Sequence, residues 1–290
     1  MNKWLMAFRP KTLTAAVVPI VVATALVYAL GHDVLWWVSA SALLASLFIQ
    51  IATNLFNDVI DFKKGADTEE RIGPQRVTQS GVIEAKKVYL IAGFCLLMAF
   101  LLGVPLVVRG GLPIVCVGLI SMFLAYSYTG GPWPLAYRGL GDIFVLLFFG
   151  LIAVAGVFYI HTLVLHPAVF IAGLQVGLLC TVLIAINNIR DVEQDKLVQK
   201  NTLPVRFGLG FARAEVLLLI VLSFACLLYW WFIGEHYAAL MPLLFLPLAL
   251  RLIRGLYQTP PSPLYNKFLA KSALLHLGFG MLLSLGLIIA

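Results

Sequence analysis

Residues 35–71 read LWWVSASALLASLFIQIATNLFNDVIDFKKGADTEER, an apolar run that leads directly into a segment rich in acidic and basic side chains. The apolar part, Leu35–Phe56, is long enough to cross the hydrocarbon core of a bilayer, which takes ~20 residues of helix. The polar part starts at Asn57 and ends at Arg71. An apolar helix that ends in a polar cluster indicates a membrane protein that works at the membrane face.

Apolar runs of this kind recur along the whole chain. Hydrophobic residues make up 62% of the 290 residues and charged residues only 11%, whereas a soluble domain carries about 25% charged residues. With a mean hydropathy of +1.00, the composition excludes a soluble globular protein. We predict an all-α, polytopic membrane protein that forms a single domain over residues 1–290. Nine stretches are predicted to be transmembrane helices: Leu13–Leu30, Leu35–Phe56, Val88–Val108, Leu112–Tyr128, Leu140–Ile160, Ala168–Ile186, Glu215–Ile233, Tyr237–Ile253 and Phe268–Ile289.

The basic residues predict the orientation of these helices. When the connections are sorted by side, 19 of the 20 Lys and Arg residues fall on one side of the membrane and only Arg109 falls on the other. By the positive-inside rule, the N-terminus and the two long polar loops are cytoplasmic and the C-terminus is outside, in the plasma (inner) membrane. Topology and attraction to anionic lipid also account for the net charge of +7, so we expect no nucleic-acid partner.

A second polar segment follows the stretch Ala168–Ile186. It contains Asn187, Asp191 and Asp195 at spacings of four residues, which predicts one polar stripe on a helix. Asn57 and Asp61 have the same spacing after Leu35–Phe56. The two motifs are four spans apart, so we predict an internal repeat of two four-helix halves followed by a last helix.

These two acidic clusters need a compensating charge. An Asp at a helix C-terminus opposes the helix dipole, and a charge at membrane depth costs ~2.5–3.5 kcal/mol on insertion scales. Mg²⁺ takes one or two carboxylates together with water and substrate phosphates, so two facing clusters predict Mg²⁺ ions that bridge a diphosphate. The neighbouring bases suit phosphate oxygens: Lys63, Lys64, Arg71 and Arg76 after the first cluster, and Lys196, Lys200 and Arg206 after the second.

The alternative is that these are solvated loop charges that obey the positive-inside rule. That alternative explains the number of Lys and Arg residues. It does not explain why Asn-x₃-Asp occurs at the ends of two helices. We therefore favour the metal-diphosphate interpretation, because acids at the membrane interface are functional by default.

The sequence resembles a known family over nearly its whole length. Asn57-Asp58-x-x-Asp61 followed by Asp67, and the later Asp191-x₃-Asp195, resemble the two Asp-rich motifs of the UbiA superfamily of aromatic prenyltransferases. The spacing of Asp67 from Asp61 is similar to the branch that prenylates 1,4-dihydroxy-2-naphthoate in menaquinone synthesis; the hydroxybenzoate branch has a closer third Asp. Further segments resemble the naphthoate branch: Phe8–Leu13, Arg71–Pro74, Gly139–Asp142, Asn187–Asp191, Lys200–Leu203 and Arg206–Gly208.

The resemblance implies a reaction and a set of site residues. Mg²⁺ would assist ionisation of an allylic diphosphate, and an electron-rich ring carbon of the naphthoate would then attack the allylic cation, with loss of the ring carboxylate, to give a demethylmenaquinone. Implied catalytic residues are Asp61, Asp191 and Lys200. Implied Mg²⁺ ligands, direct or through water, are Asn57, Asp58, Asp61, Asp67, Asp191 and Asp195. Implied substrate-binding residues are Lys11, Arg71, Arg76, Tyr126, Tyr128, Arg138, Asp142, Asn187, Asn188, Lys200 and Arg206.

Several of these residues have a simpler alternative role. Tyr126 and Tyr128 either line the acceptor pocket and shield a cation or belong to the interfacial aromatic belt. Asp142 either orients the acceptor or caps the helix that it opens. Arg138 either meets the acceptor's carboxylate or anchors the chain at the cytoplasmic face. His276, inside an apolar stretch, is expected to be a packing residue with its hydrogen bonds satisfied.

Naphthoate prenylation has alternatives inside and outside the enzyme class. Phytyl transfer to the same acceptor and polyprenyl transfer to 4-hydroxybenzoate remain alternatives within the enzyme class. A membrane transporter is the alternative outside it, since repeats and membrane acids also mark carriers. A carrier places ionisable groups near the bilayer midplane, whereas here the helix interiors are nearly free of charge and the acids gather at one face. That distribution favours the enzyme.

Overall fold

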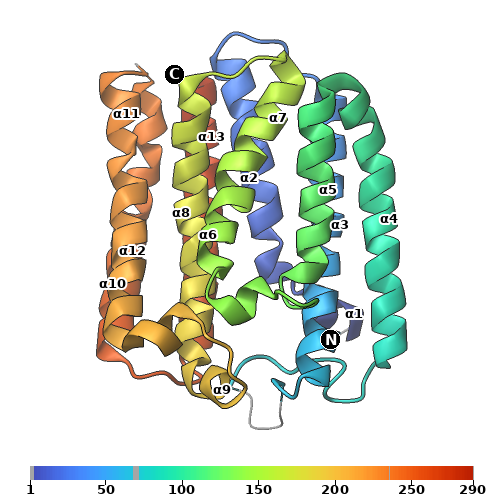
Figure 1. Ribbon diagram of the computed structural model, residues 1–290. Coiled ribbons are helices and arrows are strands. Elements are labelled where there is room, and N and C mark those ends of the chain that lie inside the picture. Colours follow the sequence, from blue (N-terminus) through green and yellow to red (C-terminus); the bar gives the residue numbers. More distant parts are fainter. Residues whose placement is uncertain (1–2, 68–71, 235, 290) are drawn as a thin grey trace.

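The computed structural model describes residues 3–67, 72–234 and 236–289, and this part of the chain contains helices and no strand. The helices lie side by side and run in alternating directions, so that α1 and the end of α13 lie at opposite ends of the bundle (Figure 1). In chain order the elements are α1 (Lys3–Phe8), η1 (Pro10–Thr12), α2 (Thr14–Ala29), α3 (Trp36–Lys63), α4 (Ala85–Gly110), α5 (Leu112–Ser127), η2 (Leu135–Arg138), α6 (Gly141–Leu146), η3 (Leu147–Leu151), α7 (Ile152–Thr162), α8 (Pro167–Arg190), α9 (Val192–Leu197), α10 (Leu203–Ala225), α11 (Leu227–Phe232), η4 (Tyr237–Phe245), α12 (Leu246–Gln258) and α13 (Tyr265–Ile289).

The described helices confirm the all-α class but not the count of nine spans. Seven helices or continuous helical runs are long and apolar enough to cross a membrane. An eighth is obtained if the segment Lys3–Thr12 and α2, which meet at 46°, count as one broken span. α5 is apolar but has only 16 residues. Helices of this composition identify an integral membrane protein.

The packing does not confirm a division into two four-helix halves. α2 makes its most extensive contacts with α13, from the other end of the chain, rather than with its sequence neighbour α3. The larger buried core joins α2, α7, α8, α10, α12 and α13, while a smaller one joins α1, α3 and α4. Helix ridges fit whichever apolar face is complementary, so packing partners do not follow sequence order.

The ends of α3 and α8 carry the two acidic motifs. α3 continues past the apolar run to Lys63, which confirms that Asn57 and Asp61 lie on one helical face. α8 ends at Arg190, but the N–H of Asp191 still donates to the Asn187 carbonyl (3.1 Å) and the N–H of Asp195 to the Asp191 carbonyl (2.8 Å). The predicted stripe of Asn187, Asp191 and Asp195 is therefore essentially continuous.

The helix that begins at α6 starts inside the bundle, well above the ends of α3 and α8 in Figure 1. It packs closely on α8 because both helices have glycine at the contact. A Cβ at Gly150 in η3 would lie 2.5 Å from the Gly173 carbonyl oxygen, and a Cβ at Gly177 would lie 2.6 Å from the Leu146 carbonyl oxygen. Small residues permit this close approach of helices in membranes, and it brings the end of α6 and η3 against α8.

The far end of the bundle holds the basic residue that the charge pattern sets apart. The Arg109 guanidinium donates to the carbonyl oxygens of Ile160 (2.6 Å) and His161 (2.8 Å), at the C-terminal end of α7. His161 is 3% exposed and its ring nitrogens contact the Leu35 N–H and the Ser39 hydroxyl, both at 3.1 Å. Arg109 thus satisfies helix-end carbonyls, a role compatible with its isolation.

Candidate active site

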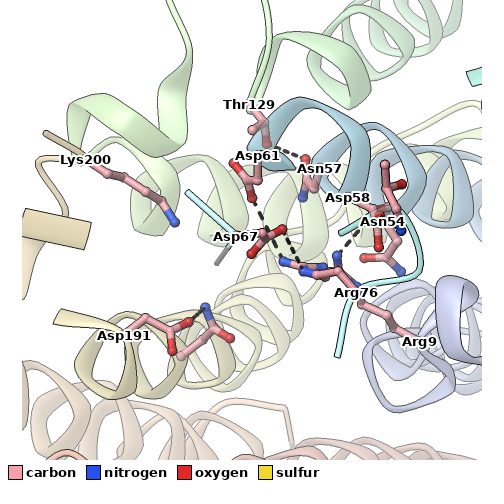
Figure 2. A network of polar contacts seen from close by, with 12 residues as sticks. Arg9, Asn54, Asn57, Asp58, Asp61, Asp67, Arg76, Thr129, Asp191 and Lys200 are labelled. Carbon is pink, nitrogen blue, oxygen red and sulfur yellow. Dashed lines mark hydrogen bonds and ion pairs between the residues drawn. The ribbon is translucent and has the colours of Figure 1, made fainter. Parts of the chain in front are cut away.

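A cavity of about 210 Å³ opens between α2, α3, α6, α8 and α13, at the end of the bundle where the two motifs lie. Polar residues from both motifs line it. Asn57, Asp61 and Arg76 lie on one side, and Asn187 and Lys200 come from the other motif. Figure 2 shows Lys200 and Asp191 across from Asp61 and Arg76.

The first motif forms a chain of contacts around Asp61. The Tyr137 hydroxyl donates to Asp61 Oδ1 at 2.9 Å, and the Arg76 guanidinium lies 3.9 Å from Asp61 Oδ2. Arg76 Nε also lies 3.3 Å from Asp67 Oδ2, so one buried arginine joins two carboxylates of this motif. Thr129 donates its hydroxyl hydrogen to the side-chain oxygen of Asn57.

The second motif is balanced by a buried arginine. Arg190 is 1% exposed and donates to both carboxylate oxygens of Asp191, at 2.7 and 2.6 Å. Its remaining donors reach the side-chain oxygens of Asn187 (2.7 Å) and Asn266 of α13 (2.8 Å). Because a buried carboxylate needs a partner charge, Arg190 balances the charge of Asp191 next to the cavity.

Asp195 and Lys200 form the other ion pair of this motif, at 3.3 Å. Burial raises the pKa of the Asp195 carboxyl to about 6, the ammonium of Lys200 opposes that shift, and Asp191 and Asp61 add to it. Burial acts to lower the pKa of Lys200, but the carboxylates of Asp195, Asp61 and Asp191 together raise it above its usual value. The two motifs therefore share one electrostatic environment.

Tyr137 lies between the cationic and anionic groups. The Lys64 ammonium is 4.1 Å and the Lys200 ammonium 5.8 Å from the centre of its ring. Burial and then the Asp61 carboxylate raise the pKa of the Tyr137 hydroxyl far above its usual range. Tyr137 is therefore a neutral hydrogen-bond donor that orients Asp61.

Four further predicted substrate-binding residues line the cavity: Lys11, Tyr128, Asp142 and Asn188. Lys11 is exposed at the mouth, whereas Asp142 is 5% and Asn188 6% exposed. Because Tyr128 lines the cavity, a role in the acceptor pocket is favoured over a place in the interfacial aromatic belt. The side chain of Asp142 makes no capping hydrogen bond in the described helix, which disfavours its role as a helix cap.

Other predicted residues lie away from the cavity. The carboxylate of Asp58 accepts the backbone N–H groups of Val77 (3.3 Å) and Thr78 (3.0 Å), in the loop after α3. Arg138 lies over the Trp133 ring, with its guanidinium carbon 3.7 Å from the ring centre. Tyr126 is 40% exposed. Arg206 is exposed and lies against Gly139, and Arg71 lies outside the described residues.

Sequence reasoning missed several residues that the structure brings to the site: Gln50, Thr129, Tyr137, Arg190 and Asn266. One of them had a readable signal. Gln50, Asn54, Asn57 and Asp61 follow one another at intervals of four, three and four residues, which is a single polar face of an α-helix. His276 was also misjudged: it is 1% exposed, and neither ring nitrogen has a hydrogen-bond partner among the described residues.

The donor set can be tested against a metal ion. The described residues contain no group of three or more His, Cys, Asp and Glu side chains that could hold a metal ion by themselves. Magnesium seldom needs such a cage, because it binds through one or two carboxylates and completes its shell with water and substrate phosphates. Asp61 and the amide side chains of Asn57 and Asn187 line the cavity, whereas Asp67, Asp191 and Asp195 lie outside its lining. One carboxylate with amide oxygens from both motifs fits that mode of binding.

A second, larger cavity of about 400 Å³ continues from the first into the apolar part of the bundle. The two cavities share lining residues Ala15, Thr53, Tyr128, Val145 and Phe149. Beyond these the second cavity is lined almost entirely by apolar side chains of α2, α3, α4, α5 and the run from α6 to α7. A polar head site thus joins an apolar channel, as an amphiphilic substrate with a charged head requires.

Known proteins are similar to this chain in sequence and in fold. Residues 16–277 match the model of the UbiA prenyltransferase family. The chain belongs to the UbiA prenyltransferase family. It is a prenyltransferase, and its relatives in the family include the 1,4-dihydroxy-2-naphthoate octaprenyltransferase of Haemophilus influenzae (35% identical, covering 100% of this chain and 96% of the relative). The enzyme of the same name from Escherichia coli is 39% identical over 77% of this chain and 74% of its own.

Solved structures of UbiA homologs have the same fold. The apo structure of a UbiA homolog from Aeropyrum pernix superposes with a TM-score of 0.71 at 14% identity, covering 96% of this chain and 97% of that one. A UbiA homolog from Archaeoglobus fulgidus bound to GPP and Mg²⁺ superposes with a TM-score of 0.62 at 16% identity, over the whole of both chains. At 14% and 16% identity, these comparisons show a shared fold and carry no statement about substrates.

Proposed function

We propose that this protein transfers a polyprenyl group from polyprenyl diphosphate to 1,4-dihydroxy-2-naphthoate, with Mg²⁺ and with loss of the ring carboxylate, to give a demethylmenaquinone. The observation that carries the proposal is a polar cavity, lined by residues from both Asp-rich ends, that opens into an apolar cavity. The naphthoate acceptor is supported by relatives of that activity from Haemophilus influenzae, Escherichia coli and Bacillus subtilis, at 35%, 39% and 32% identity.

The polar cavity is proposed to hold the diphosphate. Bound Mg²⁺ would neutralise the departing diphosphate and so favour cleavage of the allylic C–O bond. The ligands that we propose, direct or through water, are Asn57, Asp61, Asp67, Asp191 and Asp195. Asp58 is left out of this set, because its carboxylate binds loop backbone. Lys11, Arg76, Lys200 and Asn187 are proposed to contact the diphosphate, since they line the same cavity.

The apolar cavity is proposed to hold the isoprenoid tail. Its walls offer hydrocarbon contact and exclude water, which otherwise captures an allylic cation. Gly103, Gly118 and Gly156 line it, and a Cβ at any of them would meet nothing within 4 Å. A bulky residue there would fill the channel, so Gly156→Phe is expected to shorten the longest prenyl diphosphate that is used while short ones still react.

The membrane arrangement is part of the proposal. We propose nine spans in the plasma (inner) membrane, with the N-terminus and the active-site end cytoplasmic and the C-terminus outside. The charge pattern supports this, because the basic residues gather at the end that carries the site. Accessibility of single introduced cysteines to a membrane-impermeant reagent would test each connection.

One assay tests the acceptor and the diphosphate chemistry together. Purified protein in lipid nanodiscs is given a long prenyl diphosphate with either naphthoate or 4-hydroxybenzoate, with Mg²⁺ or with a chelator. We expect turnover only with naphthoate and Mg²⁺, and release of CO₂ equal to the product formed. Transfer to 4-hydroxybenzoate alone would refute the acceptor, and full turnover by both Asp61→Ala and Asp191→Ala would refute the site.

One relative supports phytyl diphosphate as a second candidate for the prenyl donor. The 2-carboxy-1,4-naphthoquinone phytyltransferase of Synechocystis is 32% identical over 98% of this chain and 92% of its own. Phytyl diphosphate has the same allylic head group and a more saturated tail. Competition between phytyl and polyprenyl diphosphate in the same assay identifies the preferred donor.

A further inference from the structure

Two side chains that line the polar cavity carry buried oxygen atoms with no hydrogen-bond partner among the described residues. Gln50 on α3 is 8% exposed, and its Oε1 atom has no partner. Asp142 on α6 is 5% exposed, and neither of its carboxylate oxygens has one. A buried polar atom without a partner destabilises the structure that contains it, because it has lost its hydrogen bonds to water. Two such residues that face one cavity therefore indicate a ligand that brings hydrogen-bond donors.

Both residues lie deeper in the membrane than the diphosphate groups. Gln50 precedes Asn57 by seven residues, which is about 10 Å along a helix. The Thr181 hydroxyl donates to the main-chain oxygen of Asp142 at 3.5 Å, so Asp142 lies at the depth of Thr181. Thr181 precedes Asn187 by six residues, or about 9 Å. Gln50 and Asp142 thus lie at similar depth, each about 10 Å farther into the bundle than Asn57 or Asn187.

The walls around these groups suit a flat aromatic ring. Val145, Phe149 and Leu183 line this cavity and supply apolar surface. Tyr128 reaches the first turn of α6 because Gly141 has no side chain: a Cβ there would lie 2.8 Å from the Tyr128 hydroxyl oxygen. An acceptor with ring hydroxyls would meet hydrogen-bond acceptors at its edge and hydrocarbon at its faces.

We propose that Gln50 and Asp142 form the acceptor subsite, and that the Asp142 carboxylate takes the proton of a ring hydroxyl during transfer. This inference rests on the proposed prenylation of a hydroxylated aromatic. The O–H electron pair becomes the π bond of a ring C=O, and a ring π pair forms the new C–C bond to the allylic carbon. The allylic C–O bond breaks with its electron pair on the diphosphate, and the proton passes to Asp142. When the carboxylate then leaves as CO₂ from the prenylated carbon, its C–C electron pair restores the ring π bond, the C=O π pair returns to oxygen, and Asp142 gives the proton back to that oxygen. Gln50 Oε1 accepts a hydrogen bond from the acceptor and so positions it.

The surroundings of Asp142 bear on its protonation. Tyr128 and Cys180 line the same cavity, and the nearby acidic residue Glu215 lies on α10, which packs against α8. The basic side chains of the site pair with the motif carboxylates: Arg76 with Asp61 and Asp67, Arg190 with Asp191, and Lys200 with Asp195. Among the described residues, no Lys or Arg forms a salt bridge with Asp142. A carboxylate without a fixed cation is free to change protonation within the catalytic cycle.

The test compares Asp142→Asn, Asp142→Glu and Gln50→Leu with the wild type in nanodiscs. For Asp142→Asn we expect kcat to fall about 100-fold or more, as for loss of a general base, and the acid limb of the pH profile to disappear. Asp142→Glu should restore part of kcat and the limb. Gln50→Leu should raise KM for the acceptor about tenfold and change kcat little.

Binding of a non-hydrolysable prenyl thiodiphosphate separates this inference from the proposed function. All three variants should bind this analogue with wild-type affinity and Mg²⁺ dependence. Loss of analogue binding, or an unchanged kcat and pH profile in Asp142→Asn, would overturn the assignment. If the wild type prenylates neither aromatic acceptor, the proposed function fails instead. Thermal unfolding with the analogue bound checks that each variant is folded.

Discussion

Asp58 and Asp61 are three residues apart on α3, yet the structure gives them different partners. Asp58 accepts the N–H groups of Val77 and Thr78, whereas Asp61 lines the cavity beside Arg76. Replacing each with Asn keeps its shape and removes its charge. We expect Asp58→Asn to weaken the hydrogen bonds that hold the loop after α3, and Asp61→Asn to lower the catalytic rate.

The structure sets the size of both effects. A hydrogen bond to a charged group contributes ≈ 1.5–3 kcal/mol, against ≈ 0.5–1.5 for a neutral pair. Asp58→Asn weakens one such bond and loses an acceptor for the other, a cost of about 2 kcal/mol. At 1.36 kcal/mol per tenfold, the loop amides should exchange with solvent roughly 30-fold faster. Asp61→Asn removes a carboxylate from the cavity and should lower kcat about 10²–10³-fold, by analogy with loss of one electrostatic group.

Two measurements on the same preparations separate the outcomes. Hydrogen exchange read by mass spectrometry reports the segment that contains Val77 and Thr78. Mg²⁺ titration of turnover reports the metal site, and there Asp58→Asn should stay within about threefold of the wild type while Asp61→Asn needs far more Mg²⁺. If Asp58→Asn shifts the Mg²⁺ titration as much as Asp61→Asn and leaves amide exchange unchanged, the two carboxylates do not have the separate roles assigned to them.

Three further substitutions have defined outcomes. Tyr137→Phe keeps the ring beneath the lysines but removes the hydrogen bond to Asp61, so kcat should fall about tenfold for a loss of roughly 1.5 kcal/mol; an unchanged kcat would show that Asp61 needs no orientation. Arg190→Leu removes the buried guanidinium that balances the charge of Asp191, at about 3–5 kcal/mol, and should lower the unfolding temperature sharply. Restoring stability with Asp191→Leu in the same chain would support that cause. Gly177→Ala places a methyl against the α6 backbone and should cost about 1–3 kcal/mol in thermal unfolding.

The sequence predicted the class of structure and the identity of the motifs. Apolar runs of about 20 residues require helices in a bilayer, because unpaired backbone groups are too costly there. The extension of α3 and the stripe on α8 followed from four-residue spacings, which place side chains on one helical face whatever the helix packs against. Apolar length and local periodicity therefore sufficed for the fold class and for placing Asn57 with Asp61, and Asn187 with Asp191, on one helical face each.

The partners of these residues were decided only by tertiary structure. Arg190 looked like one loop cation among many, and its burial against Asp191 and Asn266 depends on how α8 meets α13. Tyr137 reaches Asp61 because the loop before α6 folds into the bundle. The depth of Asp142 depends on glycine contacts between η3 and α8.

The number of spans and the packing order of the helices also separate what the sequence predicts from what tertiary structure decides. Hydropathy is a property of each segment, so it gave the apolar stretches, but it says nothing of which faces fit together. α2 packs on α13, across almost the whole length of the chain. Residue types and their spacing determined what chemistry the chain carries, while the shapes of distant helix faces determined where each group lies and what it contacts.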